Sequence, residues 1–217
     1  MTRIVLASAS RGRREVLRQA GIDPEIRVAD VDEEALAASH EEVLDPLPPL
    51  ARAEATTCLL ATAKARTVAA HLGPVETPTL IIGADSLLLL GEELQGKPHT
   101  AERARERWLA QRGATAHLVT GHALILIGNE RGDERSAAAT TELRFADLSD
   151  DEIDAYVATG EPLEVAGAFT LDGLGAPYVT HLVGDYHNVI GLSLALTRRL
   201  AADMGVFWPS LWPQPAK

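Results

Sequence analysis

Apolar and polar residues follow one another along the chain in blocks that predict strands interleaved with helices. Residues 50–72 form the clearest helix, because small and apolar side chains recur there at alternating intervals of three and four. The residues of this predicted stripe are Ala51, Ala55, Cys58, Thr62, Ala65, Ala69 and Leu72. Short, mostly apolar runs predict strands at 4–9, 25–31, 79–84, 116–127 and 139–145, and residues 87–90 continue the third of these past Asp85. Strands that alternate with helices favour an α/β fold with a mixed sheet.

Capping residues and glycines mark the ends of three further predicted helices. A helix that begins at an N-cap and stops at a glycine is predicted from Ser10 to Gly21, from Thr100 to Gly113 and, with a capping box, from Ser149 to Gly160. The remaining predictions are a loop or short helix over 35–49, a glycine-rich segment over 167–191 and a final helix over 192–204.

Length and composition indicate one domain. The chain has 217 residues, and a typical domain has roughly 100–200. We expect a single domain over residues 1–207 and a loose C-terminal tail over residues 208–217. Hydrophobic residues make up 46% of the chain and aromatic residues only 4%, so the core is expected to consist mainly of aliphatic side chains.

The acidic charge balance excludes some classes of partner. With 20 Lys and Arg against 31 Asp and Glu, the formal charge is −11, which opposes general binding to a nucleic-acid polymer or to an anionic membrane. Cys58 is the only cysteine, so an intrachain disulfide and a cysteine-rich zinc site are excluded. The longest apolar stretch, 80–90, is interrupted by Asp85 and is far short of the ~20 residues that span a bilayer. The expected location is the cytoplasm.

Three arginines follow the first predicted strand, in the segment Ser8-Ala9-Ser10-Arg11-Gly12-Arg13-Arg14. The first turn of a helix carries positive potential from its unpaired N–H groups, so acidic side chains would be the stabilising choice there. The arginines repel one another unless an anion occupies the turn, and phosphate is the usual occupant. The alternative is a solvated basic helix end that binds nothing.

Asp85 directly follows the apolar run of the 79–84 strand. A carboxylate in such a position is costly to bury unless it is paired or binds a metal. Ligand sites in open α/β sheets lie at the carboxyl ends of strands, so Asp85 would fall in a site if the strand stops or kinks at Gly83. The alternative role is a helix cap or a core ion pair.

Other charged residues carry weaker signals. Gly91 to Pro98 nearly matches a phosphate-binding P-loop, but Pro98 replaces the hydroxyl residue that would hold Mg²⁺, and the loop contains two glutamates; we reject a P-loop. Lys97 in its Gly-Lys-Pro turn could still reach a phosphate. Lys64 either extends past apolar neighbours to solvent or reaches into a cleft, and Glu33 is a weak candidate metal ligand. His117 and His122 fit a strand surface or a core better than a metal site.

Together these segments resemble the Maf family of nucleoside triphosphate pyrophosphatases, and the resemblance covers most of the chain. The family opens with a strand and a Ser-x-Ser-Pro-Arg-Arg-x-Glu-Leu-Leu turn, which is similar to residues 8–17. The other matching motifs are Gly83-Ala84-Asp85, Gly96-Lys97-Pro98, Thr120-Gly121, Gly160-Glu161-Pro162, Ala166-Gly167-Ala168-Phe169 and Val189-Ile190-Gly191-Leu192-Ser193. Each motif is weak by itself, but the set in this order is specific.

The resemblance implies a fold, a reaction and a set of site residues. The implied fold is a mixed, twisted sheet flanked by helices, with two lobes around a central cleft. The implied reaction converts a nucleoside triphosphate, ordinary or non-standard, and water into a nucleoside monophosphate and pyrophosphate, with Mg²⁺ or Mn²⁺ as cofactor. Asp85 is then the catalytic carboxylate, and Glu33 and Asp85 hold the metal. The implied substrate contacts are Ser10, Arg13, Lys64, Lys97 and Asp172.

The resemblance leaves alternatives open. Nucleoside triphosphates are the expected partners in either case, and a homodimer is allowed. The competing function is a catalytically weak, nucleotide-binding regulator of septum formation and cell division. Only the enzyme predicts metal-dependent release of pyrophosphate.

Three positions depart from the family pattern. Arg11 stands where the family has proline, and Gly12 where it has the first arginine. Asp172 stands where the pyrimidine-preferring branch has glutamine. The family links the last two positions to the choice of base, so a preference for dTTP or UTP is not carried over. Arg11 is a candidate replacement for the missing charge.

Overall fold

A single mixed sheet forms the centre of the computed structural model, which describes residues 2–128 and 133–213. In these residues seven strands take the order β2-β1-β3-β5-β6-β7, and β4 pairs with β3. The strands are β1 (Arg3–Leu6), β2 (Glu25–Ile26), β3 (Thr79–Leu90), β4 (Glu93–Gln95), β5 (Thr115–Ile127), β6 (Asp133–Phe145) and β7 (Val179–Val183). Strand β1 is parallel to β2 and β3, and the other pairings are antiparallel.

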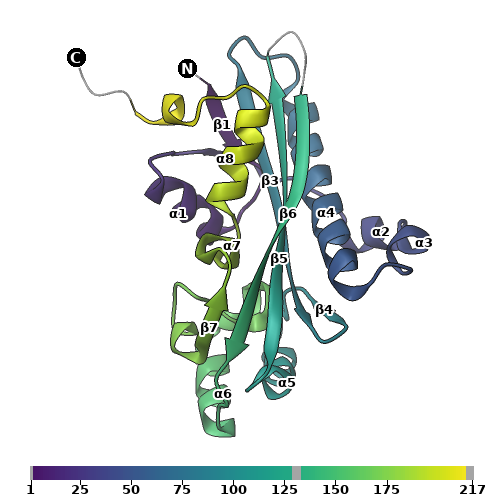
Figure 1. The fold of residues 1–217 in the computed structure, drawn as a ribbon, viewed down its shortest axis with the longest axis vertical. Coiled ribbons are helices and arrows are strands. Elements are labelled where there is room, and N and C mark those ends of the chain that lie inside the picture. Colours follow the sequence, from purple (N-terminus) through teal and green to yellow (C-terminus); the bar gives the residue numbers. More distant parts are fainter. Residues whose placement is uncertain (1, 129–132, 214–217) are drawn as a thin grey trace.

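Helices flank this sheet on both faces, which confirms the expected α/β class. The α-helices of the described residues are α1 (Arg11–Gln19), α2 (Glu33–Ala38), α3 (Glu41–Leu44), α4 (Pro49–Leu72), α5 (Ala101–Gln111), α6 (Asp150–Ala158), α7 (Tyr186–Ile190) and α8 (Leu194–Asp203). Helix α4 lies along one face of the long strands, whereas α1, α7 and α8 lie on the other (Figure 1). Helices α5 and α6 pack together near the lower end of the view.

The predicted starts of three helices are confirmed by their caps. The hydroxyl groups of Ser10, Thr100 and Ser149 each accept a hydrogen bond from the backbone N–H three residues further on. Ser149 also forms the predicted capping box with Glu152. These bonds satisfy backbone donors that the helix itself leaves unpaired, which is why the local sequence was sufficient to place them.

The long strands carry apolar clusters at both ends. At one end Leu80 and Leu124 pack with α1 and α8, and at the other Leu88 and Leu118 pack around the fully buried Trp108 of α5. The same continuous strands contribute to both clusters. The division into two lobes and the central cleft between them stay predictions.

Strand β3 runs on to Leu90, which confirms the predicted continuation over 87–90. It does not stop or kink at Gly83, so the condition that would place Asp85 at a strand end is not met. β3 pairs with β5 without interruption from Thr79 opposite Ile127 to Leu89 opposite His117. The unbroken ladder carries the strand past Asp85, which therefore lies inside β3 and not at its end. A different feature must open the sheet at Asp85.

The predicted stripe of α4 is also wrong, although the helix itself is confirmed. Of the predicted stripe only Ala65 is buried; the buried side chains are Ala53, Thr56, Thr57, Leu60, Ala61, Ala65 and Val68. The helix is rich in alanine and threonine on every side, so its sequence gives little contrast between faces. The sheet decides the orientation, because Gly83 and Gly121 present no side chain to α4. An added Cβ at Gly83 would lie 2.2 Å from the Ala61 carbonyl oxygen, and one at Gly121 would lie 2.2 Å from the Thr57 carbonyl carbon.

Two smaller expectations need correction, and one is confirmed. The strand expected over 25–31 contains only the two residues of β2. The 35–49 segment, expected as a loop or a short helix, contributes to the short helices α2 and α3. The tail expected to be loose is partly packed, since residues 208–211 form a 3-10 helix and Leu211 is buried in the cluster that contains Ile22. Residues 214–217 of this tail lie outside the described residues.

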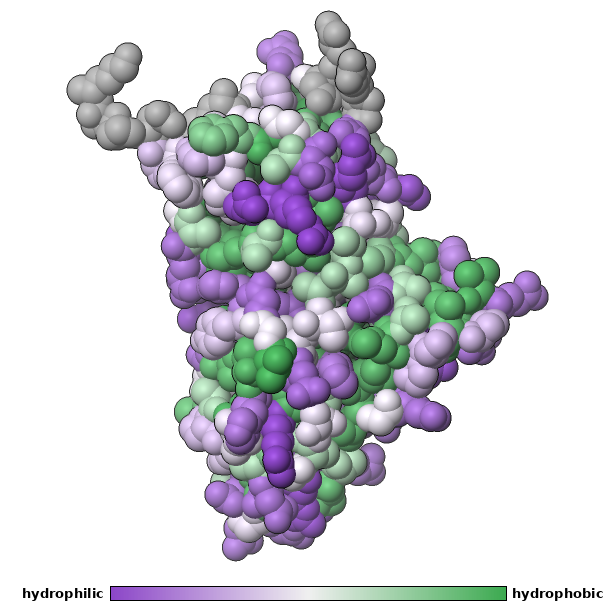
Figure 2. Space-filling model, in the orientation of Figure 1, coloured by the Kyte–Doolittle hydropathy of each residue, from purple (hydrophilic) through white to green (hydrophobic). Residues whose placement is uncertain are grey.

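Hydrophilic and hydrophobic side chains share the face of the molecule drawn in Figure 2. Hydrophilic and hydrophobic residues are interspersed on the face drawn in Figure 2, and no single hydrophobic area covers it. Across residues 2–128 and 133–213, no helix combines the length and the apolar character needed to cross a membrane.

Gly83→Ala should destabilise the fold, because the new Cβ would collide with the backbone of α4. Overpacking of this kind typically costs roughly 1–3 kcal/mol. The matched control is Gly96→Ala, where the nearest atom would be a Leu87 methyl at 3.7 Å. Urea unfolding of both variants measures the difference, and equal stabilities would contradict the close approach of α4.

Candidate active site

The sheet opens along one edge of β3, at residues 83–87, which we call the β3 gap. Strand β5 occupies the other edge, so β1 and β4 must share this one. Strand β1 pairs with β3 only as far as Ile82, and β4 pairs only from Leu88 onward. Asp85 lies at the middle of the gap. The parting of two neighbouring strands, and not the end of β3, is therefore what leaves this stretch of its edge unpaired with another strand.

Asp85 is held in an ion pair with Lys64, which also contacts Glu33. The Lys64 Nζ lies 2.5 Å from Asp85 Oδ1 and 2.8 Å from Glu33 Oε1. The side chains of Lys64 and Asp85 are only 12% and 10% exposed, whereas Glu33 is 49% exposed. Lys64 thus turns inward to Asp85 and does not extend to solvent, whereas a cleft at this place stays a prediction. Glu33, Lys64 and Asp85 come from three different elements and form one continuous group of charges.

Burial is the main influence on the pKa of the Asp85 carboxylate. Burial raises the pKa of Asp85 above its ordinary value, and the charge of Glu33 adds to this rise. The cations Lys64 and Arg13 oppose it without cancelling it. The approach of Lys64 depends on Gly121, which pairs with Asp85 across the sheet and leaves room for the α4 backbone. A carboxylate with a raised pKa beside two cations is typical of a functional site.

Arg13 turns inward and connects three parts of the fold. Its Nε donates to the Gly191 carbonyl (3.0 Å), Nη1 donates to Ser8 Oγ (3.0 Å) and to the Ala84 carbonyl (2.7 Å), and Nη2 donates to Ser86 Oγ (3.1 Å). These bonds use four of the five donors of the guanidinium group. Burial lowers the pKa of Arg13, while the negative charges near it work in the opposite direction.

The predicted arginine cluster is therefore not one surface. Arg13 occupies the β3 gap, whereas Arg11 and Arg14 are exposed. Ser10 caps α1, where its hydroxyl accepts from Arg13 N at 3.4 Å. Close packing explains the glycine at position 12, because a Cβ there would lie 2.9 Å from the Ile190 carbonyl oxygen. Phosphate contacts by Ser10 and Arg13, and the replacement of the missing charge by Arg11, stay predictions.

Lys97 lies at the turn that follows β4. The Gly96 carbonyl just before it accepts hydrogen bonds from Gly167 N (3.1 Å) and Arg107 Nη1 (2.6 Å). Lys97 itself is half exposed, and its Nζ lies 3.7 Å from Glu164 Oε2. The turn is thus held rigidly beside the gap while its ammonium remains accessible. Arg107 was not identified from the sequence, because its role depends on a contact with a distant carbonyl.

Asp172 lies in a loop that folds around another carboxylate, Glu161. Glu161 accepts hydrogen bonds from the backbone N–H groups of Leu174 and Gly175, both at 3.1 Å, and from the hydroxyl of Thr170. Asp172 is exposed on this loop, and the structure does not bring it into contact with Asp85. Its expected substrate contact stays a prediction.

Glu161 was included in a matching motif but was given no role from the sequence. Burial of its carboxylate acts to raise the pKa of Glu161, but hydrogen bonds from Thr170, Leu174, Gly175 and Tyr156 outweigh burial and lower it. The available signal was the glycine-rich 173–175 segment, which allows backbone N–H groups to converge on one carboxylate.

A buried polar network supports the face of β3 opposite α4. Ser86 Oγ lies 2.9 Å from Thr120 Oγ1, which donates to the Asn188 carbonyl at 3.1 Å. His122 extends the network, because its Nε2 accepts from Ser193 N at 2.8 Å. Burial, with the charge of Arg13, lowers the pKa of His122 to about 4. His122 is thus a neutral core residue, as expected.

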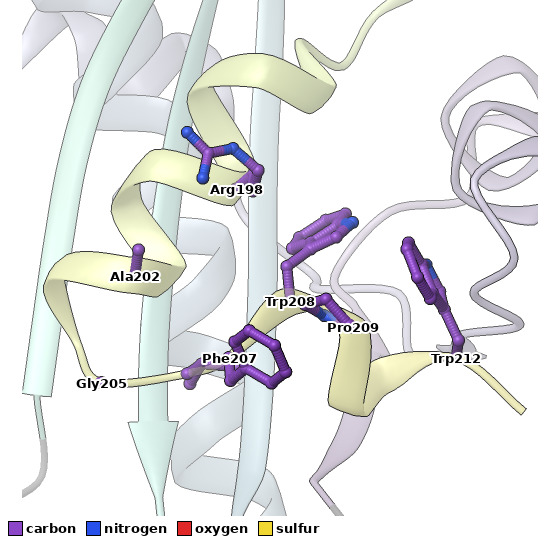
Figure 3. A pocket seen from close by; sticks show the side chains of 8 residues that line it. Arg198, Ala202, Gly205, Phe207, Trp208, Pro209 and Trp212 are labelled. Carbon is purple, nitrogen blue, oxygen red and sulfur yellow. The ribbon is translucent and has the colours of Figure 1, made fainter. Parts of the chain in front are cut away.

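An apolar groove elsewhere on the molecule lacks the chemistry of the β3 gap. The groove measures about 580 Å³ and is bordered by α8 and the segment after it. Figure 3 shows the rings of Phe207, Trp208 and Trp212 along it, with Arg198 above them. With one cation and no carboxylate among its lining residues, the groove does not compete with the gap as a site for hydrolysis.

The gap offers two carboxylates to a divalent cation. No cluster of three or more His, Cys, Asp or Glu side chains suited to a metal occurs in the part of the chain that the structure describes. Glu33 and Asp85 converge on Lys64 Nζ, so their oxygens surround a position of positive charge. Mg²⁺ commonly takes only one or two protein carboxylates and completes its shell with water and substrate phosphates. The donor set therefore fits a metal that arrives with a phosphorylated substrate.

Comparisons with known proteins give a consistent family. The family model described as Maf-like protein matches residues 3–204. The chain is 49% identical over 215 residues to the nucleoside triphosphate pyrophosphatase of Nocardia farcinica, covering 99% of this chain and 98% of that protein. It is 50% identical over 216 residues to the protein of the same name from Mycolicibacterium vanbaalenii, with 98% and 99% covered. Against that of Streptomyces coelicolor it is 50% identical over 210 residues, with 97% and 94% covered.

Arg13→Met should lower the free energy of unfolding, because it leaves the buried Ala84 and Gly191 carbonyls without the hydrogen bonds that the partly buried guanidinium donates. Each unsatisfied buried group costs about 1–3 kcal/mol, so we expect a loss on the order of 3 kcal/mol. The control is the exposed Arg14→Met, which should lose little. Denaturant unfolding of the two variants is the measurement, and equal losses would show that Arg13 does not hold these elements together.

His122 should make stability fall with acidification. Its folded pKa of about 4 lies below the ~6.5 of an unfolded histidine, so the neutral ring stabilises the fold fully above pH ~6.5 and progressively less towards pH 4. Melting temperatures of wild type and His122→Gln between pH 7.5 and 4.5 measure this. The variant should have the shallower slope, and parallel curves would show that His122 is not the group responsible.

Proposed function

The chain belongs to the Maf family, and from this premise we propose that it is a nucleoside triphosphate pyrophosphatase. It hydrolyses a nucleoside triphosphate to the monophosphate and pyrophosphate. The observation that carries the proposal is the buried Asp85 carboxylate in the β3 gap, paired with Lys64 and close to Arg13. The names of the relatives agree with this activity.

Hydrolysis at the α-phosphorus needs an oriented water and neutralisation of the triphosphate charge. Asp85 is the group that accepts a proton from the water, because it is a carboxylate within the open stretch of the sheet edge. Its raised pKa increases its basicity towards that proton. Lys64 and Lys97 are the cations that contact phosphate, while Arg13 fixes the backbone at Ala84 next to Asp85.

Glu33 and Asp85 would hold a divalent cation, Mg²⁺ or Mn²⁺. Such an ion supplies charge neutralisation to phosphate oxygens when bound. Its protein ligands come from two elements, Asp85 from β3 and Glu33 from the first residue of α2. The metal, the site roles and a location in the cytoplasm are parts of this proposal, as is the absence of nucleic-acid and membrane partners. Both a monomer and a homodimer are compatible with it.

A nucleotide-binding regulator of septum formation is the second candidate. It would bind the same ligand but would not need a buried carboxylate next to the phosphates, where negative charge weakens binding. The Asp85 geometry therefore favours the enzyme. Removal of non-standard nucleotides is the biological role that this activity would serve.

A panel of ordinary and modified nucleoside triphosphates tests the activity and the choice of base together. We expect metal-dependent pyrophosphate release with broad base preference, because the carboxylate of Asp172 only accepts hydrogen bonds, whereas a glutamine would both donate and accept. Initial rates with each substrate give the comparison. No pyrophosphate from any substrate would refute the enzyme, and sharp selection of dTTP and UTP would refute only the role given to Asp172.

Asp85→Asn should abolish turnover without loss of stability. Loss of a general base costs ~10²–10⁴-fold, and loss of a metal ligand adds to this. The melting temperature should stay constant or rise, since burial disfavours the charged form of Asp85. Pyrophosphate release and melting temperature are measured on the same sample, with Asp154→Asn, which breaks an exposed ion pair with Arg105, as the control. An active but less stable Asp85→Asn protein would assign Asp85 a purely structural role.

A further inference from the structure

Lys64 occupies the position between two carboxylates that a divalent cation would need. Its Nζ contacts Asp85 Oδ1 at 2.5 Å and Glu33 Oε1 at 2.8 Å. Two carboxylates that converge on one point attract a cation of either kind, an ammonium group or a metal ion. The two cannot occupy the same point together, and like charges so close would repel strongly.

Arg13 does not relieve this competition. Its four hydrogen bonds go to neutral oxygens, two of them backbone carbonyls and two serine hydroxyls. It lies near enough to influence Asp85 electrostatically, but within the described part of the chain none of these hydrogen bonds goes to Asp85 or Glu33. Lys64 is therefore the direct counterion of both Glu33 and Asp85.

The surroundings of Lys64 allow it to change partners. The side chain extends from α4 on a flexible four-carbon stem, with the buried Leu60 and Val68 one turn away on either side. Glu33 begins the short helix α2, which contributes no buried side chain to the core, and is half exposed. The contact between Lys64 and Glu33 can therefore break without disturbing the core, whereas Asp85 is fixed in β3.

An ammonium group that leaves two carboxylates needs another anion, because an unpaired buried charge is strongly unfavourable. A triphosphate supplies that anion at the same site. We propose that Lys64 is an exchangeable internal cation, which holds the metal position in the free protein and moves to phosphate when a triphosphate brings the divalent cation. Metal binding then becomes dependent on the triphosphate. The identity of the incoming anion rests on the proposed function, whereas the competition between Lys64 and a metal does not.

The test is the binding of Mn²⁺ alone, measured by isothermal titration calorimetry and by the Mn²⁺-induced shift in melting temperature. Wild type should bind Mn²⁺ weakly. Lys64→Met should bind it at least tenfold more tightly and show the larger rise in melting temperature, because the two carboxylates have lost their ammonium. Lys64→Gln is a second variant, for the case that Lys64→Met folds poorly, because its amide can still donate to a carboxylate. The same gain in Mn²⁺ affinity is expected of it.

Two controls locate the effect. Arg66 lies on the same helix as Lys64, and Arg66→Met removes only its exposed ion pair with Glu134. The Arg66→Met protein should therefore bind Mn²⁺ as weakly as wild type. Adding Asp85→Asn to either Lys64 variant should remove the gained affinity. A gain that survives Asp85→Asn would place the Mn²⁺ elsewhere and overturn the proposal.

Inorganic tripolyphosphate tests the exchange itself. With tripolyphosphate present at a fixed free Mn²⁺ concentration, wild type should gain Mn²⁺ affinity, whereas the Lys64 variants should gain much less. The proposal is overturned if folded Lys64 variants bind Mn²⁺ no more tightly than wild type, or if tripolyphosphate strengthens binding equally in all proteins. Absence of pyrophosphatase activity in wild type would refute the proposed function but would leave the Mn²⁺ comparison as a separate result.

Discussion

The buried carboxylate of Asp85 is the constraint on which the site depends. A negative charge inside a sheet is unfavourable unless cations lie next to it, and the fold brings Lys64 from α4 into direct contact. That contact requires α4 to lie against the sheet, which Gly83 and Gly121 permit by presenting no side chain. The packing of the longest helix and the placement of the charged group are thus one arrangement.

The two faces of β3 have different roles at Asp85. On the α4 face, Asp85 and its ion pair provide the chemistry. On the other face, Ser86, Thr120 and Asn188 form a hydrogen-bonded network that Arg13 joins. Because Arg13 also binds the Ala84 carbonyl, it fixes the backbone next to Asp85. We infer that this network keeps the open edge of β3 in shape where no neighbouring strand supports it.

Local sequence signals predicted the parts of the structure that depend on neighbouring residues. The caps Ser10, Thr100 and Ser149 could be identified because their hydrogen bonds reach only three residues along the chain. The buried face of α4 could not, because its orientation is decided by glycines on distant strands. The sequence indicated Asp85 as an unusual carboxylate, because a charge after an apolar run is costly to bury, but the strand end that would have placed it in a site does not exist. Its pairing with Lys64 and Glu33 depends on contacts between elements 21 or more residues apart. The individual residues do not reveal these contacts, and only the family resemblance assigned the three side chains to one site.

A crystal structure with Mn²⁺ and a nucleoside triphosphate analogue that resists cleavage between the α- and β-phosphates tests the central claim most directly. The account predicts anomalous density for Mn²⁺ bound to Asp85 and Glu33, the α-phosphorus beside Asp85, and Lys64 on a phosphate oxygen. An analogue bound away from the β3 gap, with Lys64 still between the two carboxylates, would contradict it.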